Sequence, residues 1–172
     1  ACRIMRRGSG YPSAFNADAV FMEQLGMGKR VEDARTGGTS GCVETGSFGK
    51  EAYILHGYLN VPKILELTLN NGIDPLTGKK ISSATGDPIH FRDFEEFYRA
   101  FEKQLAHVVD IKISTDNYIQ RMFARFAPAP YLSMLIHDCI ENGKDYYDGG
   151  PRYNTDYIQC CGIGTVTDSL SV

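Results

Sequence analysis

The sequence predicts an α/β fold that is rich in helices. Three observations carry this prediction: residues 91–126 repeat apolar side chains at three- and four-residue steps, residues 152–164 form an extended stretch, and glycines surround Cys42. Apolar residues three or four positions apart share one face of a helix, whereas side chains in a strand alternate between two faces. With 172 residues, the chain is long enough to bury a sizeable core in one domain.

The first third of the chain contains short helices and one ambiguous segment. Asn16 is a suitable N-cap for a helix over residues 17–25, which Gly26 would end. Residues 29–35 are compatible with a second short helix, and residues 52–59 are compatible with either a strand or a helix. A clear helix begins at residues 60–62, because proline fits the first helical turn, and Gly72 is its expected C′ residue.

The remaining two thirds alternate turns, helices and a strand. Residues 72–90 are rich in glycine, proline and aspartate, so we expect an exposed connection there. The helical pattern of residues 91–126 is long for one globular helix, and we expect a break near residues 114–116. A shorter helix is predicted over residues 131–141, stopping at Asn142-Gly143, and the strand over residues 152–164 leads into another helix at residue 165.

Composition excludes several classes of function. A net charge of −3 gives no electrostatic reason to expect nucleic acid or an anionic membrane as a partner. No apolar run approaches the roughly 20 residues that a membrane-spanning helix needs, and nothing resembles a signal peptide. The five cysteines lack a disulfide-framework spacing, so we expect reduced thiols in the cytoplasm.

Cys42 and Glu44 are the candidate catalytic residues. In an extended backbone their side chains would point the same way, about 6.5 Å apart at ~3.3 Å per residue. A thiol that can give up a hydrogen atom, next to a group that can move a proton, suits radical elimination chemistry. Glycines 37, 38, 41 and 46 allow close approach of the backbone around this pair. The simpler alternative is a small buried cysteine on a glycine-rich turn.

Other catalytic, metal-binding and nucleotide-binding arrangements have less support in the sequence. Cys42 could act as a thiolate nucleophile with His56, but the nearby Glu44 carboxylate would raise the pKa of the thiol. Cys160 and Cys161 lack the spacing of a zinc or redox motif, and the histidines lack ligand spacing, so no metal site is expected. Gly162 and Gly164 lack the other elements of a nucleotide-binding loop and are interpreted as a packing turn.

Several ordered segments resemble the glycyl radical enzymes. Residues 37–46, Gly-Gly-Thr-Ser-Gly-Cys-Val-Glu-Thr-Gly, with residues 48–53 after them, are similar to the thiyl loop of that family. Residues 63–72, 78–79, 149–155 and 162–165 are similar to later segments of the family. The chain is therefore identified by resemblance as a member of the pyruvate formate-lyase-like glycyl radical enzymes.

The residues after Cys42 narrow the resemblance. Relatives that act on choline, glycerol or diols typically have proline after Gly-Cys-Val-Glu, whereas this chain has Thr45. Val43 argues against formate lyase activity itself, which uses two adjacent cysteines. The closest resemblance is to the branch that dehydrates trans-4-hydroxy-L-proline. An arylacetate decarboxylase, a glycerol or diol dehydratase, a formate acetyltransferase-like enzyme and an inactive truncated segment remain as alternatives.

The resemblance implies a ten-stranded α/β barrel made of two antiparallel five-stranded half-barrels. Residues 1–172 would be a single helix-rich segment of that barrel domain and would carry the thiyl-cysteine loop. The family's glycyl radical motif lies far C-terminal to this loop, so we expect an internal fragment that lacks its radical domain and is inactive alone. The complete protein is expected to be a homodimer.

The resemblance also implies the chemistry. A protein glycyl radical, installed by a radical S-adenosylmethionine activating enzyme, would oxidise Cys42 to a thiyl. The thiyl would abstract a hydrogen atom from a small-molecule substrate, at the carbon next to the hydroxyl-bearing one. Glu44 would act as general acid or base while water leaves, and Tyr58 falls where relatives place an aromatic beside the substrate. The cysteine and the carboxylate are expected to lie in a dry barrel interior.

Overall fold

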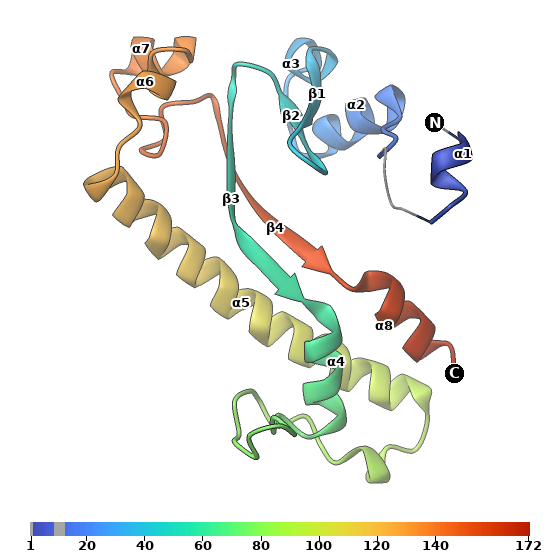
Figure 1. Cartoon of the computed structure of the whole chain (residues 1–172). Coiled ribbons are helices and arrows are strands. Elements are labelled where there is room, and N and C mark those ends of the chain that lie inside the picture. Colours follow the sequence, from blue (N-terminus) through green and yellow to red (C-terminus); the bar gives the residue numbers. More distant parts are fainter. Residues whose placement is uncertain (1, 9–12) are drawn as a thin grey trace. The chain divides into compact units, whose positions relative to one another are not determined.

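The computed structural model describes residues 2–8 and 13–172, and these residues form a mixed α/β structure, as predicted (Figure 1). The helices are α1 (Cys2–Met5), α2 (Ala17–Gly26), α3 (Val31–Arg35), α4 (Val61–Leu69), α5 (Phe94–Phe126), α6 (Pro130–Ser133), α7 (His137–Asn142) and α8 (Ile163–Leu170), together with the 3₁₀ helix η1 (Pro88–His90). The strands are β1 (Gly37–Ser40), β2 (Glu44–Ser47), β3 (Glu51–Asn60) and β4 (Tyr153–Cys161). Strand β1 pairs with β2, and β3 pairs with β4.

The chain divides into two compact units. The first comprises the residues up to Ile54 together with Gln120–Tyr157, and the second comprises Leu55–Ile119 and Ile158–Val172. Strands β3 and β4 each contribute residues to both units.

The first unit contains the β1–β2 hairpin beside helices α2 and α3 (Figure 1). Helix α2 begins as predicted, because the Asn16 side chain accepts hydrogen bonds from the amides of Asp18 and Ala19 at 2.8 and 3.1 Å. Helix α3 confirms the predicted second short helix. A separate apolar cluster supports this unit. Its buried members are Ala52, Ile54, Ile136, Cys139 and Tyr146.

The ambiguous segment at residues 52–59 is a strand, β3. Gly57 has a φ of 135°, which a helix does not allow. The pairing with β4 begins where the Tyr153 amide donates to the Lys50 carbonyl at 3.0 Å. Pairing to a segment about a hundred residues away in sequence therefore decided a choice that local periodicity left open.

The second unit is built around helix α4. Asn60 caps it by accepting from the Lys63 amide at 3.2 Å, and Pro62 occupies the first turn, as predicted. The predicted stop is displaced by one residue: Asn71, with φ of 50°, is the left-handed C′ residue, and the amide of Gly72 bonds back to the Leu67 carbonyl at 2.7 Å. The buried core of this unit consists of Leu59, Val61, Ile64, Leu65, Phe101 and Val166.

Helix α5 runs unbroken through 33 residues, so the predicted break near residues 114–116 is wrong. Polar side chains that could interrupt the helix instead bond along it. The Thr115 hydroxyl donates to the Ile111 carbonyl at 2.8 Å, and Lys112 pairs with Asp116 one turn later. Lys112 also reaches the carbonyl of His56 on β3 at 3.3 Å. These bonds satisfy groups that would otherwise compete with the helical backbone.

The helix predicted over residues 131–141 is two short helices, α6 and α7. Between them Ile136 leaves the helical conformation and is 7% exposed, whereas its neighbour Leu135 is 63% exposed. Asp145 stabilises the interruption, because its Oδ2 accepts from the Ala129 amide at 2.9 Å and from the Ser133 hydroxyl at 2.8 Å. Burial of one isoleucine and a carboxylate from a later loop thus outweigh local helix propensity. The predicted stop at Asn142-Gly143 is confirmed, with Gly143 left-handed.

The connection over residues 72–90 is turn-rich, as predicted, and exposes Leu76 and Ile89.

Strand β4 ends at Cys161, and α8 starts two residues earlier than predicted. Gly162 makes that turn with φ of 77°, and a side chain there would meet Pro62 at 2.4 Å. Close packing explains this glycine, which confirms the interpretation of a packing turn.

Candidate functional site

Cys42 lies at the tip of the β1–β2 hairpin. The strands pair antiparallel with Ser40 opposite Glu44, so residues 41–43 form a three-residue turn. Gly41 opens the turn with φ of 71°, and a Cβ there would lie 2.6 Å from a Glu44 carboxylate oxygen. Glycine is therefore required at this position for two reasons, backbone conformation and space.

The Glu44 carboxylate folds back over this turn. Its Oε2 accepts hydrogen bonds from the backbone amides of Cys42, at 2.9 Å, and Val43, at 3.1 Å. The amide of Glu44 itself, followed by those of Val43 and Cys42, lowers the pKa of the carboxyl group below its ordinary value. Glu44 is consequently an ionised carboxylate at neutral pH.

The predicted extended backbone around Cys42 is wrong, although the two residues do lie together. Because residues 41–43 turn, the period of two does not apply, and the carboxylate contacts the amide of Cys42. A three-residue turn leaves amides unpaired by the strand ladder, and a carboxylate at the first position of the next strand is close enough to accept from them. The turn, and not the side-chain alternation of an extended strand, thus brings the Glu44 carboxylate next to Cys42.

The thiol is accessible in this chain. Cys42 is exposed and free of any disulfide, and the neighbouring Val43 is 49% exposed. The alternative of a small buried cysteine is therefore wrong. The dry surroundings that were expected for the pair are not formed by these residues.

Tyr58 and His56 both lie on β3 within the second unit. The Tyr58 side chain is 64% exposed. The group that contacts the backbone amide of Cys42 is the Glu44 carboxylate.

Sequence reasoning missed a buried ion pair beneath the hairpin. The Lys29 ammonium lies 2.5 Å from a Glu51 carboxylate oxygen, with the two side chains 3% and 0% exposed. The same oxygen of Glu51 accepts from the Ser47 amide at 2.7 Å, at the end of β2. Nothing periodic marks these residues, and the only available signal is that two charged residues flank a glycine-rich segment.

A second buried carboxylate joins β4 to the base of α3. Asp33 accepts from Lys50 at 2.5 Å, from the Tyr153 hydroxyl at 2.8 Å and from Arg152 at 3.2 Å. The hydrogen bond from Lys50, followed by those from Tyr153 and Arg152, lowers the pKa of Asp33 to about 2. Arg152 also bonds to Asp138 on α7 at 3.0 Å. This cluster thus links α3, α7 and the start of β4 within the first unit.

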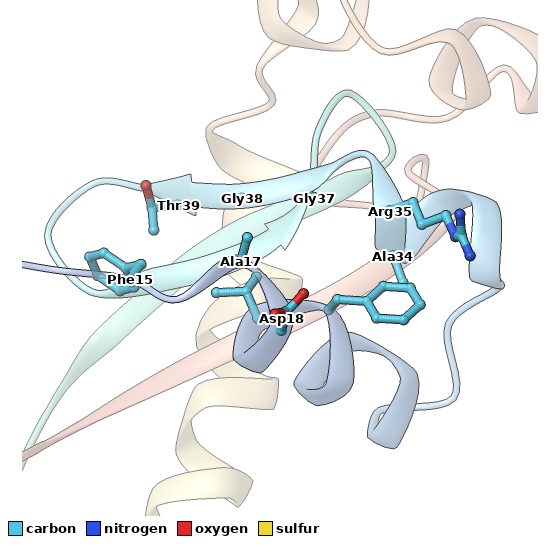
Figure 2. Close-up of a pocket in the computed structure, with 10 residues that line it drawn as sticks. Phe15, Ala17, Asp18, Ala34, Arg35, Gly37, Gly38 and Thr39 are labelled. Atoms are coloured by element: carbon cyan, nitrogen blue, oxygen red, sulfur yellow. The ribbon is translucent and has the colours of Figure 1, made fainter.

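A pocket of about 510 Å³ lies on the β1 side of the hairpin, beside the start of α2 (Figure 2). Figure 2 shows Phe15 and Thr39 at one end and Arg35 with Ala34 at the other, with Gly37 and Gly38 between them. None of the candidate catalytic or substrate-binding residues lines it. The pocket therefore stays separate from the Cys42–Glu44 pair.

Within residues 2–8 and 13–172, no group of three or more histidine, cysteine, aspartate or glutamate side chains is arranged to hold a metal ion. Across that same part of the chain, no helix combines the length and apolar character needed to cross a bilayer.

Residues 1–172 match the model of a protein family that is described as Pyruvate formate lyase-like. The chain belongs to the pyruvate formate lyase-like family. The resemblance inferred from residues 37–53 is confirmed by this match. In sequence the chain is 57% identical over 171 residues to trans-4-hydroxy-L-proline dehydratase of Clostridioides difficile, covering 99% of this chain and 22% of that protein.

Two solved structures closely match the backbone conformation of this chain. A crystal structure of hydroxyproline dehydratase from Clostridioides difficile, with trans-4-hydroxy-L-proline bound, matches with a TM-score of 0.90 at 57% identity, over 99% of this chain and 22% of that one. The glycerol-bound B12-independent glycerol dehydratase from Clostridium butyricum matches with a TM-score of 0.85 at 35% identity, over 96% and 21%. The chain thus spans about a fifth of the length of the relatives it matches.

Proposed function

We propose that these 172 residues are a segment of a glycyl radical dehydratase that eliminates water from trans-4-hydroxy-L-proline. The observation that carries this proposal is the 57% identity, across 99% of the chain, to a trans-4-hydroxy-L-proline dehydratase. The glycerol dehydratase, by comparison, shares 35%. The complete protein would be a ten-stranded barrel of two antiparallel half-barrels, with residues 1–172 as one segment of it. It would work as a cytoplasmic homodimer.

In this proposal Cys42 carries the hydrogen atom. A protein glycyl radical outside this chain, installed by a radical S-adenosylmethionine activating enzyme, supplies the oxidising equivalent. The accessible, disulfide-free thiol at the hairpin tip fits that role. The Cys42 sulfur, as a thiyl, forms an S–H bond by taking hydrogen from the carbon next to the hydroxyl-bearing one. It returns that hydrogen atom to the product radical after water has left, so the thiyl is regenerated.

In this proposal Glu44 is the general base and acid of the elimination. Elimination of the hydroxyl as water requires one proton at the departing oxygen. Because the amides of the turn keep Glu44 ionised at neutral pH, it starts as a base and donates only after accepting a proton from the substrate amine or from water. The products are water and a cyclic imino acid, and the atoms of the substrate are conserved. Tyr58, exposed on β3, is the proposed substrate contact.

The dry surroundings that radical chemistry needs would come from the rest of the barrel. Water exclusion strengthens electrostatic contacts and prevents side reactions of reactive intermediates. In this chain the hairpin tip is exposed, so the segment by itself is expected to be inactive.

The test uses the complete reading frame, activated under anaerobic conditions, with pyrroline formation as the readout. Cys42→Ala and Glu44→Gln are expected to reduce turnover to background. Cys160→Ala is the matched control, because Cys160 is also an exposed free thiol but lies on β4, and its turnover is expected to match the wild type. Wild-type turnover by Cys42→Ala would refute the radical mechanism. Turnover of glycerol or an arylacetate in place of hydroxyproline would assign the enzyme to another branch of the family.

A further inference from the structure

Thr45, the residue after Glu44, is held by its side chain as well as by the strand. It is 6% exposed and lies on β2, facing helix α2. Its hydroxyl donates to the Glu23 carboxylate, whose oxygens lie 2.9 and 3.0 Å away, and accepts from the Gln24 amide at 3.3 Å. The hydroxyl therefore uses both its donor and its acceptor capacity toward one helix.

Those contacts continue into the buried ion pair. Gln24, which is fully buried, accepts through its amide oxygen from the Lys29 ammonium, and Lys29 pairs with Glu51 at 2.5 Å. The Tyr157 hydroxyl proton faces two acceptors, the carbonyl of Thr45 and the other oxygen of Glu51, which lies 3.1 Å away. The hydrogen bonds therefore form a closed ring that leaves Thr45 through its side chain and returns to it through its backbone.

Thr45, Gln24, Lys29 and Glu51 of this ring are buried and Tyr157 is half-buried, so an unpaired polar group in the ring would be costly. A buried polar network is rigid when every member is satisfied, whereas a missing member leaves polar groups unpaired in a low-dielectric environment. Glu51 also accepts from the Ser47 amide, so β2 is tied at Thr45 and again two residues later. Glu44 precedes Thr45 directly, and its carboxylate must reach the amides of the turn.

We infer that Thr45 is a positioning residue, which fixes the strand that carries Glu44 and thereby aligns the carboxylate with the Cys42 turn. This inference rests on the proposed function, because it assigns Thr45 a role in the same elimination. Threonine suits the position because it fits a strand and supplies the hydroxyl that joins α2. Thr45→Val keeps the shape of the side chain and removes only that hydroxyl.

The experiment compares Thr45→Val and Thr45→Ser in the complete, activated enzyme. Thr45→Val is expected to lower kcat roughly ten- to a hundredfold with little change in KM, the scale expected for a misplacement of about 1 Å. Thr45→Ser, which restores the hydroxyl, is expected to recover most of this loss. The acid limb of the kcat pH profile should also move to higher pH in Thr45→Val, because Glu44 loses the amide bonds that hold its pKa down.

Thr36→Val is the matched control, because its hydroxyl donates to the Asp33 carbonyl at 3.0 Å, outside the ring. Its kcat and pH profile should match those of the wild type. An active wild type with unchanged kcat and pH profile in Thr45→Val would overturn the inference and leave the proposed function intact. A wild type that forms no pyrroline would instead refute the proposed function. A loss of thermal stability in Thr45→Val without a change in kcat would show that the ring is structural only.

Discussion

Replacement of Asp33 by asparagine tests whether the buried carboxylate cluster stabilises the first unit. Asp33 is fully buried and bonds to Lys50, Tyr153 and Arg152. Asp33→Asn keeps the size and one acceptor oxygen but removes the charge that two cations face. The substitution therefore isolates the electrostatic part of the contact.

The magnitude follows from the pKa. The pKa of Asp33 is about 2 in the folded chain, against an ordinary value of 3.8. At 1.36 kcal/mol per pKa unit, this difference corresponds to about 2 kcal/mol of stability. Because Lys50 and Arg152 are each 33% exposed, solvent screening makes this an upper value. Even so, it is a large share of the roughly 5–15 kcal/mol that stabilises a typical domain.

The sign of the pH dependence is also determined. A carboxyl group with a lowered folded pKa stabilises the protein fully above its unfolded pKa, and the contribution is lost as pH falls through the folded value. The free energy of unfolding of the wild type should thus exceed that of Asp33→Asn at pH 6, and this gap should close between about pH 4 and pH 2.

Urea unfolding of the chain, followed by tyrosine fluorescence and circular dichroism at each pH, measures the gap. The chain contains ten tyrosines and no tryptophan, which makes tyrosine the fluorescent reporter. Asp18→Asn, an exposed aspartate in the first turn of α2, is the control for general loss of negative charge. A wild-type advantage that stays constant from pH 6 to pH 2 would refute the assigned role of Asp33.

Two further substitutions probe the hairpin base. Lys29→Met should lower the free energy of unfolding by about 3–5 kcal/mol, because it leaves the buried Glu51 carboxylate without its cation. Combining it with Glu51→Gln should recover part of that loss in a denaturation double-mutant cycle, and strictly additive losses would contradict the pairing. Gly46→Ala should cost about 1–3 kcal/mol, since the new Cβ would lie 2.4 Å from Glu51 and 2.7 Å from Tyr53. Gly26→Ala, where nothing lies within 4 Å, is the control and should not destabilise the chain, and equal thermal shifts for both alanines would disprove the steric argument.

Most elements with local signals were predictable from sequence. The caps at Asn16 and Asn60 involve amides two or three residues away, so the residues that decide them are neighbours in the chain. The strand β4 and the turn-rich connection over residues 72–90 were also predicted. By contrast, the single helix predicted over residues 131–141 was wrong, because Ile136 is buried in the core and Asp145 bonds back to the end of α6.

The candidate site, too, was only partly predictable from the sequence. Glycines around a cysteine and a glutamate two residues apart were enough to single out Cys42 and Glu44. The period-two argument failed, because the backbone turns at Gly41 and the carboxylate bonds to amides of the turn. Which groups support the hairpin was not predictable, since the ring includes Tyr157, 112 residues after Thr45.

The sequence by itself determined the helix caps, the choice of Cys42 and Glu44 as candidate residues and membership of the family, because each depends on residue types at short, fixed spacing. Only the tertiary structure decided that Lys29 and Glu51 pair beneath the hairpin, and that β3 is a strand. A charge can be buried only where another part of the chain neutralises it, and a strand exists only where a partner accepts its hydrogen bonds. Both conditions join residues distant in sequence, so the folded chain alone satisfies them.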